Sequence, residues 1–127
     1  MIIFFRSRAR SFQHAFAGWW YVVSTQKNAW IHALASTLVI SLAIWLHLPA
    51  RDWAVLSLAI AIVWIAEFLN SALEAVVDLA SPNKHPLAKV GKDVGAAAVL
   101  IAALVSILIG CLILGPPLLT QITVLMK

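Results

Sequence analysis

Residues 53–80 read WAVLSLAIAIVWIAEFLNSALEAVVDLA, and this stretch decides the fold. Residues 53–66 carry no charged side chain, and the whole run is long enough to cross a membrane as one helix. Its second half nevertheless contains several polar residues: Glu67, Asn70, Ser71, Glu74 and Asp78. A charge at the centre of a spanning helix costs roughly 2.5–3.5 kcal/mol, so a chain that keeps two glutamates there is expected to use them.

Four of these residues fall on one side of the predicted helix. At about 100° per residue, their positions lie within an arc of roughly 80°. We call this set the polar stripe: Glu67, Asn70, Glu74 and Asp78. A stripe of carboxylates and an amide that points away from lipid predicts a functional site.

The composition places the chain among integral membrane proteins. Its 127 residues are 63% hydrophobic and only 11% charged, with a mean hydropathy of +0.97. Soluble domains are usually about 45–50% apolar. We expect one all-α membrane domain over residues 1–127. The net charge of +4 does not indicate a nucleic-acid partner, because the basic residues flank apolar segments and form no basic patch.

Two further apolar runs are expected to cross the membrane beside residues 53–80. The first is 30–48, and the other is 94–114, which we expect to end at Gly115-Pro116-Pro117. The connections are expected at 49–52 and 81–86.

Before the first span, residues 8–26 carry apolar side chains at helical spacing: Phe12, Phe16, Trp19, Trp20 and Val23. This pattern predicts an amphipathic helix that lies in the membrane interface.

The basic residues indicate the orientation. With three spans, the N-terminus and the loop after residue 80 lie on one side of the membrane. That side holds most of the nine basic residues: Arg6, Arg8, Arg10, Lys27, Lys84, Lys89 and Lys92. The other side has Arg51 and Lys127. By the positive-inside rule the N-terminus is cytoplasmic and the C-terminus is outside, so the polar stripe faces the compartment that holds ATP.

A basic and acidic pair, Lys92-Asp93, lies at the mouth of the third spanning helix. Magnesium takes oxygen ligands from carboxylates, phosphates and water, and a lysine near a helix N-terminus can neutralise phosphate charge. Together with the stripe, this pair predicts phosphoryl transfer. Gly91 and Gly95 are interpreted as close helix packing. The histidines show no metal-ligand spacing and are expected to be structural or interfacial: His14, His32, His47 and His85.

The motifs Glu67-x-x-Asn70-Ser71-x-x-Glu74-x-x-x-Asp78 and Lys92-Asp93 resemble those of the prokaryotic diacylglycerol kinase family, which includes the undecaprenol kinases. The resemblance runs from about residue 11 to 110 in length and segment order. It implies a homotrimeric kinase of the bacterial cytoplasmic membrane that transfers the γ-phosphate of MgATP to a lipid hydroxyl, in diacylglycerol or undecaprenol. The loop at 81–89 looks slightly more like the undecaprenol branch.

The resemblance also implies roles for individual residues. Glu67 matches the general base, and Asn70 matches a residue that orients substrate and phosphate. Glu74 matches a metal ligand, and the residues that match the nucleotide-binding positions are Glu74, Asp78, Lys92 and Asp93. Gln26 replaces a second metal-binding glutamate, so its role as a ligand for Mg²⁺ is doubtful.

Two other functions fit parts of the pattern. Intramembrane carboxylates also serve proton- or ion-coupled transporters, but such a path needs polar groups across the whole membrane, and 30–48 and 94–114 offer only Ser, Thr and His. A non-catalytic assembly subunit would not need Lys92 and Asp93 beside the stripe. Three short spans cannot shield a site from lipid on all sides, so we also expect an oligomer on physical grounds.

Overall fold

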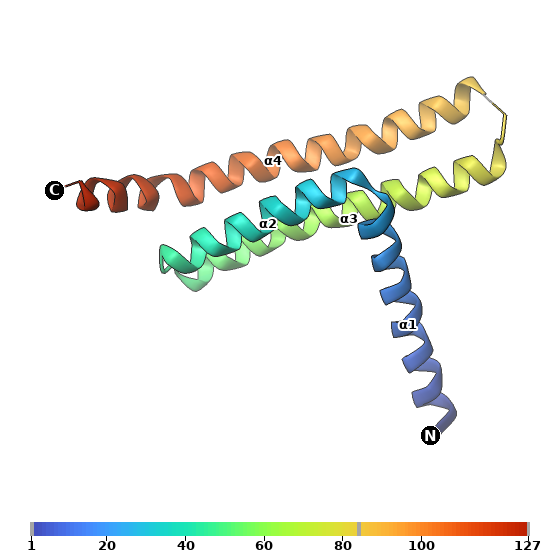
Figure 1. Cartoon of the computed structure of the whole chain (residues 1–127), viewed down its shortest axis with the longest axis horizontal. Helices are drawn as coiled ribbons and strands as arrows, with labels where there is room; N and C mark the ends of the chain where they lie inside the picture. The colour runs from blue at the N-terminus through green and yellow to red at the C-terminus, as the bar shows by residue number, and fades with distance from the viewer. Residues whose placement is uncertain (1, 84, 127) are drawn as a thin grey trace.

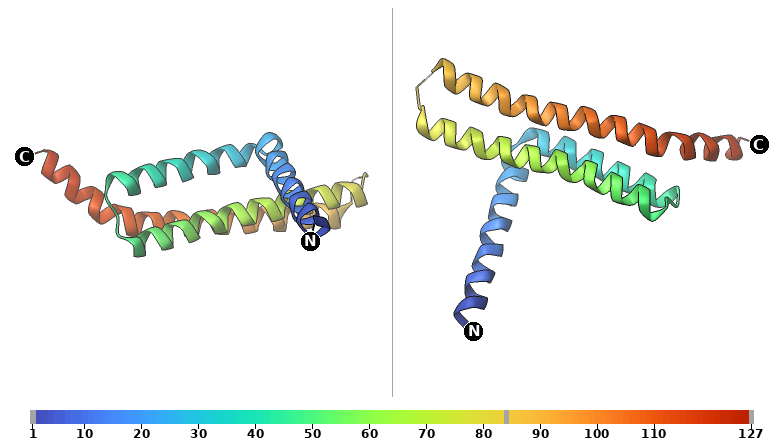
Figure 2. Two further views of the ribbon diagram at one scale, coloured as in Figure 1. Left: turned by 90° about the horizontal axis from the view of Figure 1, so that it is seen from below. Right: turned by 180° about the vertical axis from the view of Figure 1, so that it is seen from behind.

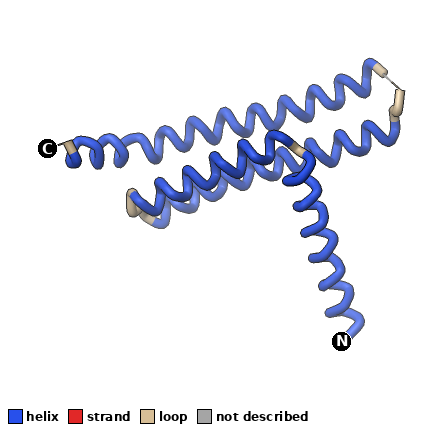
Figure 3. Tube along the Cα trace, viewed as in Figure 1, coloured by secondary structure: helices blue, strands red, loops and turns tan. Residues whose placement is uncertain are grey.

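The computed structural model describes residues 2–83 and 85–126, which form four helices and short connections (Figures 1 and 3). They are α1 (Ile2–Thr25), α2 (Lys27–Trp45), α3 (Ala50–Ala80) and α4 (Pro86–Leu125). The helices α2, α3 and α4 are each long and apolar enough to cross a membrane. The expectation of an all-helical chain is therefore confirmed, and three of its helices could cross a membrane, as predicted.

The helices α2, α3 and α4 lie side by side, whereas α1 leaves them at a steep angle (Figures 1 and 2). The most extensive contact is between the antiparallel helices α3 and α4. Both continue past the junction of α1 and α2, at the end where the connection 81–85 joins them. This end carries most of the polar stripe. At the opposite end Ala43, Leu56 and Leu114 form a small buried core between the three helices.

The turn between α2 and α3 occupies 46–49, three residues earlier than the predicted 49–52, so the first span helix ends before the predicted residue 48. The helix α2 ends at Trp45, and His47 has a φ of 52°, in the left-handed region that usually favours glycine. The backbone N–H of His47 donates to Ile44 O at 3.1 Å, and that of Leu48 donates to Ala43 O at 3.2 Å, which is the Schellman pattern of a helix C-terminus. Pro49 then precedes α3, which begins at Ala50 within the predicted turn.

The predicted end of the third helix is wrong. The helix α4 does not stop at Gly115-Pro116-Pro117 but continues to Leu125 with both prolines inside it. A proline removes one backbone hydrogen bond and bends a helix, but it does not have to end it, because the residues on either side can still bond within the helix. The far end of α4 changes direction in Figure 2.

The first helix is longer than predicted, because α1 starts at Ile2 and not near residue 8. Its described side chains are mostly exposed, with Phe16 at 70% and Trp20 at 67%. Its attachment to the other helices includes Val22, which is buried. That α1 lies in the membrane interface stays a prediction. Lys84 and Lys127, which contribute to the orientation argument, lie outside the described residues, and so does the side chain of Arg6.

Candidate active site

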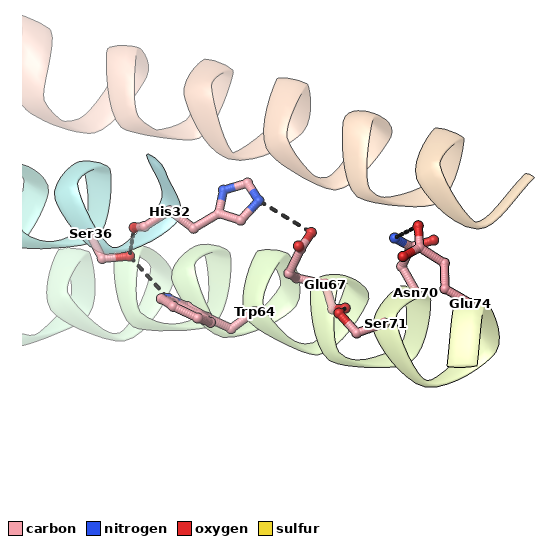
Figure 4. Close-up of polar contacts among 7 residues, drawn as sticks. All are labelled: His32, Ser36, Trp64, Glu67, Asn70, Ser71 and Glu74. Carbon is pink, nitrogen blue, oxygen red and sulfur yellow. Dashed lines mark hydrogen bonds and ion pairs between the residues drawn. The ribbon is translucent and has the colours of Figure 1, made fainter. Parts of the chain in front are cut away.

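The deepest member of the polar stripe is Glu67, whose side chain is 1% exposed. In Figure 4 its carboxyl group points from α3 towards His32 of α2. His32 Nε2 lies 3.6 Å from Glu67 Oε2, and the His32 side chain is 13% exposed. This distance is too long for a hydrogen bond, and neither atom has a hydrogen-bond partner among the described residues. A single chain thus buries Glu67, whereas the sequence predicted that an oligomer would shield the site from lipid.

One turn further along α3, Asn70 contacts the half-buried Glu74. Its Nδ2 donates to Glu74 Oε1 at 3.2 Å. Its Oδ1 is buried and without a partner among the described residues, and it lies against Gly95 of α4. A Cβ atom at Gly95 would overlap Asn70 Oδ1 and approach Leu73 Cδ2 to 3.2 Å. Close packing at Gly95 is thereby confirmed, whereas a Cβ at Gly91 would meet only Val77 Cγ2 at an ordinary 3.7 Å.

Ser71 is fully buried but faces the backbone of its own helix. Its Oγ donates to Glu67 O at 2.8 Å, a bond between residues one turn apart. Its hydroxyl hydrogen is used in this bond, so it does not serve the carboxyl group of Glu67. The role of Ser71 is structural.

The outer end of the stripe meets α4 through an ion pair. Lys92 Nζ lies 2.6 Å from Asp78 Oδ1, and both side chains are accessible to solvent. Lys92 precedes the apolar run 94–114 that is expected to lie in the membrane. The hydrogen bond to Asp78 raises the pKa of Lys92. Desolvation opposes this rise, and the negative charges of Asp78 and Glu74 add to it. The ammonium group therefore stays charged at neutral pH.

A cleft of about 660 Å³ surrounds this ion pair. Asp78, Lys92 and Asp93 line it together with Lys89 and residues of the connection 81–85. His85 lines it too, but its Nδ1 accepts a hydrogen bond from Leu87 N at 3.2 Å and so caps the start of α4. Lys92 and Asp93 lie near the end of the second turn of α4 and not at its mouth, so the helix dipole, which acts mainly within the first turn, contributes little there.

The two predicted metal ligands come from different parts of the chain. Glu74 lies on the stripe, whereas Gln26 is the residue between α1 and α2, immediately before the start of α2. Across residues 2–83 and 85–126, no three His, Cys, Asp or Glu side chains are grouped as a metal site would need. Glu74 still fits magnesium, because this ion often takes one or two carboxylates and completes its shell with phosphate oxygens and water. Such an ion would supply charge neutralisation on the phosphate groups.

The residue that sequence reasoning missed is His32. It was expected to be structural or interfacial, yet it is the polar side chain that faces Glu67. Its ring also lies edge-on to Trp64, with centroids 6.3 Å apart and an interplanar angle of 69°. Trp64 Nε1 donates to Ser36 Oγ at 3.2 Å, and Ser36 Oγ donates to His32 O at 2.7 Å. The available signal was that His32 is an ionisable residue within an apolar span. The sequence did not show which side of α2 faces α3, so the partner of His32 could not be predicted.

A second, apolar groove of about 680 Å³ runs between α3 and α4. Asn70 and Gly95 lie within it, and the other lining side chains are aliphatic. The groove is open along the helix surface that is expected to face lipid, so an apolar chain could lie in it with its polar end near the stripe.

Comparison with known proteins identifies relatives over most of the chain. Residues 13–114 match the family model described as prokaryotic diacylglycerol kinase. The chain is 47% identical to the diacylglycerol kinase of Synechocystis over 111 residues, which is 87% of this chain and 63% of that protein, less than two thirds of its length. It is 38% identical to the undecaprenol kinase of Bacillus subtilis over 109 residues, 86% of this chain and 89% of the relative. It is 39% identical to the diacylglycerol kinase of Escherichia coli K12 over 95 residues, 69% of this chain and 78% of the relative.

Proposed function

Because the chain belongs to the prokaryotic diacylglycerol kinase family and is a membrane lipid kinase, we propose that it transfers the γ-phosphate of MgATP to the hydroxyl group of undecaprenol or diacylglycerol. One observation carries this proposal: a single face of α3 joins a buried carboxyl group to a charged cleft at the end of α3 next to the connection 81–85. Glu67 and Asp78 are eleven residues apart, about 16 Å along a helix. The relatives are kinases, so the alternative of an ion-coupled transporter is not favoured.

At the buried end, Glu67 is the general base. Its carboxylate accepts the proton of the lipid hydroxyl while the hydroxyl oxygen attacks the γ-phosphorus. A new P–O bond forms to the lipid, the bond between the γ-phosphorus and the bridging oxygen breaks, and ADP leaves with that electron pair. Asn70 holds Glu74 on one side and has a free carbonyl oxygen on the other, which supports a role in orienting the reacting groups. Positioning of this kind supplies much of the catalysis in phosphoryl transfer.

At the cytoplasmic end, Lys92 and Asp93 contact the nucleotide. The triphosphate competes with Asp78 for the ammonium group of Lys92, which is charged and accessible. Glu74 would hold Mg²⁺ together with phosphate oxygens and water, and Gln26 stays a doubtful ligand because it is neutral and lies before the start of α2. Asp78 then remains beside the nucleotide as an acceptor of hydrogen bonds.

The placement in the membrane is part of the same proposal. We infer that α1 lies in the interface on the cytoplasmic side of the bacterial cytoplasmic membrane, with the N-terminus inside and the C-terminus outside. Glu67 lies beside His32, which is five residues, about 7–8 Å, below the start of α2. The base would therefore lie just beneath the interface, at the depth of a lipid hydroxyl, and the nucleotide cleft would lie outside the bilayer.

We also propose that the protein acts as a homotrimer. A single chain encloses Glu67, but it leaves the outer part of the stripe open, because Asp78 is 65% exposed and Glu74 is only partly buried. A neighbouring copy would cover these carboxylates and part of the exposed apolar surface. The number three rests on the family resemblance.

The first prediction concerns the reaction itself. In detergent–lipid micelles the purified protein should transfer radiolabelled γ-phosphate from ATP to undecaprenol or to diacylglycerol. Chelation of Mg²⁺ should abolish the labelling, because the triphosphate then lacks the cation that neutralises it. The two lipids are offered side by side, and the product is identified by chromatography. If folded protein labels neither lipid at any Mg²⁺ concentration, the proposal is wrong, and proton flux in liposomes would then test the transporter.

A second prediction concerns the nucleotide end. Lys92→Met should raise KM for ATP about 10-fold or more and leave KM for the lipid unchanged, because a charge-assisted hydrogen bond to phosphate is lost. Steady-state kinetics with each substrate varied in turn would measure this. Arg51→Met is the matched control, since Arg51 lies at the other end of α3. Equal ATP affinity in the wild type and Lys92→Met would remove Lys92 from the nucleotide site.

A further inference from the structure

The contact between α2 and α3 contains two buried polar atoms that face each other. They are His32 Nε2 and Glu67 Oε2, 3.6 Å apart, and neither has a hydrogen-bond partner in the described part of the chain. A buried carboxylate without a partner is costly, and so is a buried imidazole nitrogen. Their orientation toward each other in Figure 4 therefore calls for a functional explanation.

The His32 ring is held in place by its neighbours. Its edge-on contact with Trp64 limits rotation of the ring. Trp64 in turn donates to Ser36 Oγ at 3.2 Å, and Ser36 donates to the carbonyl oxygen of His32 at 2.7 Å. These bonds join α2 to α3 one turn away from Glu67. The imidazole is thus directed at the carboxyl group by a fixed set of contacts.

We propose that His32 is the positioning residue of Glu67, an inference that rests on the proposed function of Glu67 as the general base. With a proton on Nε2, the imidazole donates toward Oε2 once the two atoms approach by less than an ångström. This contact fixes the plane of the carboxyl group. It leaves the other oxygen, Oε1, to accept the proton of the lipid hydroxyl. His32 itself touches neither substrate.

Such a role predicts a selective kinetic effect. His32→Ala should lower kcat about 10- to 100-fold, the change in rate expected when one hydrogen bond to a charged group is lost. KM for ATP and KM for the lipid should each change less than about 2-fold. His32→Gln should recover part of kcat, because its side-chain amide can donate at a similar reach. Ser36→Ala should lower kcat by less than His32→Ala, since it only loosens the ring.

The control is His47→Asn. His47 lies in the turn between α2 and α3, and asparagine tolerates its positive φ. This variant should retain wild-type kinetics. All variants are compared for melting temperature, so that a loss of folding is separated from a loss of rate.

A spectroscopic measurement tests the contact without relying on activity. The infrared band of the Glu67 carboxylate, identified by its loss in Glu67→Gln, should shift in His32→Ala and remain in place in His47→Asn. Unchanged kcat and an unmoved band in His32→Ala would overturn the inference, as would equal loss in both His32 variants with a lowered melting temperature. A shifted band in a protein that phosphorylates no lipid would instead keep the contact and refute the proposed function.

Discussion

Replacing Glu67 with glutamine is expected to lower kcat about 100- to 10,000-fold, the usual contribution of a general base. The amide has the size and shape of the carboxyl group but cannot accept the proton of the lipid hydroxyl. KM for ATP should change little, since the nucleotide cleft lies about 16 Å along α3. Phosphate transfer to the better of the two lipids, measured at saturating MgATP, gives the result.

The same substitution should not destabilise the protein. Glu67 is 1% exposed and Oε2 has no hydrogen-bond partner among the described residues, so a neutral amide lowers the cost of burial. The melting temperature of Glu67→Gln should equal or exceed that of the wild type. Asp52→Asn makes the same chemical change in the first turn of the same helix and should leave kcat unchanged. Near-normal turnover in Glu67→Gln would assign the base to another group.

The second large effect is expected at Gly95. An added Cβ would overlap Asn70 Oδ1 and come within 3.2 Å of Leu73, so Gly95→Ala must push α4 away from α3 or displace Asn70. Overpacking of this kind costs about 1–3 kcal/mol of folding free energy. Because the displaced residue belongs to the polar stripe, kcat should fall at least about 10-fold as well. Thermal unfolding in detergent and the kinase assay measure the two effects.

Gly91→Ala provides the comparison within the same helix. Its Cβ would meet Val77 Cγ2 at 3.7 Å, which is ordinary van der Waals contact, and alanine is the better helix former by about 1 kcal/mol. Stability should be equal or slightly raised, with normal activity. If both variants behave alike, close packing at Gly95 does not position Asn70.

Much of the fold could be predicted from the pattern of apolar runs. The lengths of the three runs predicted three spanning helices, and the periodicity placed Glu67 and Asn70 on one inward face of α3, where both are buried. These features depend on local sequence and on the thickness of a bilayer. The roles assigned to the stripe, the metal and the nucleotide residues stay predictions.

What escaped prediction depends on how helices rotate against each other. Nothing in residues 30–48 says which side of α2 faces α3, so the contact between His32 and Glu67 could not be foreseen. The difference between Gly91 and Gly95 has the same origin, because both match a small-residue motif but only Gly95 meets α3 closely. The end of α4 was missed because a proline pair can bend a helix and remove two of its hydrogen bonds without ending it.

The proline pair in α4 has a consequence for how deeply the protein sits. Pro116 and Pro117 lack the N–H groups that would bond to the carbonyl oxygens of Leu112 and Ile113. From Val94 to Ile113 the helix rises about 30 Å, the thickness of a hydrocarbon core, so we expect these carbonyl oxygens at the outer boundary of the membrane, where water can reach them. Moving the helix inward by one turn would place them in the hydrocarbon core without a hydrogen-bond partner. We therefore expect the proline pair to fix the depth of α4, so that Lys92 and Asp93 at its N-terminal end stay outside the hydrocarbon core.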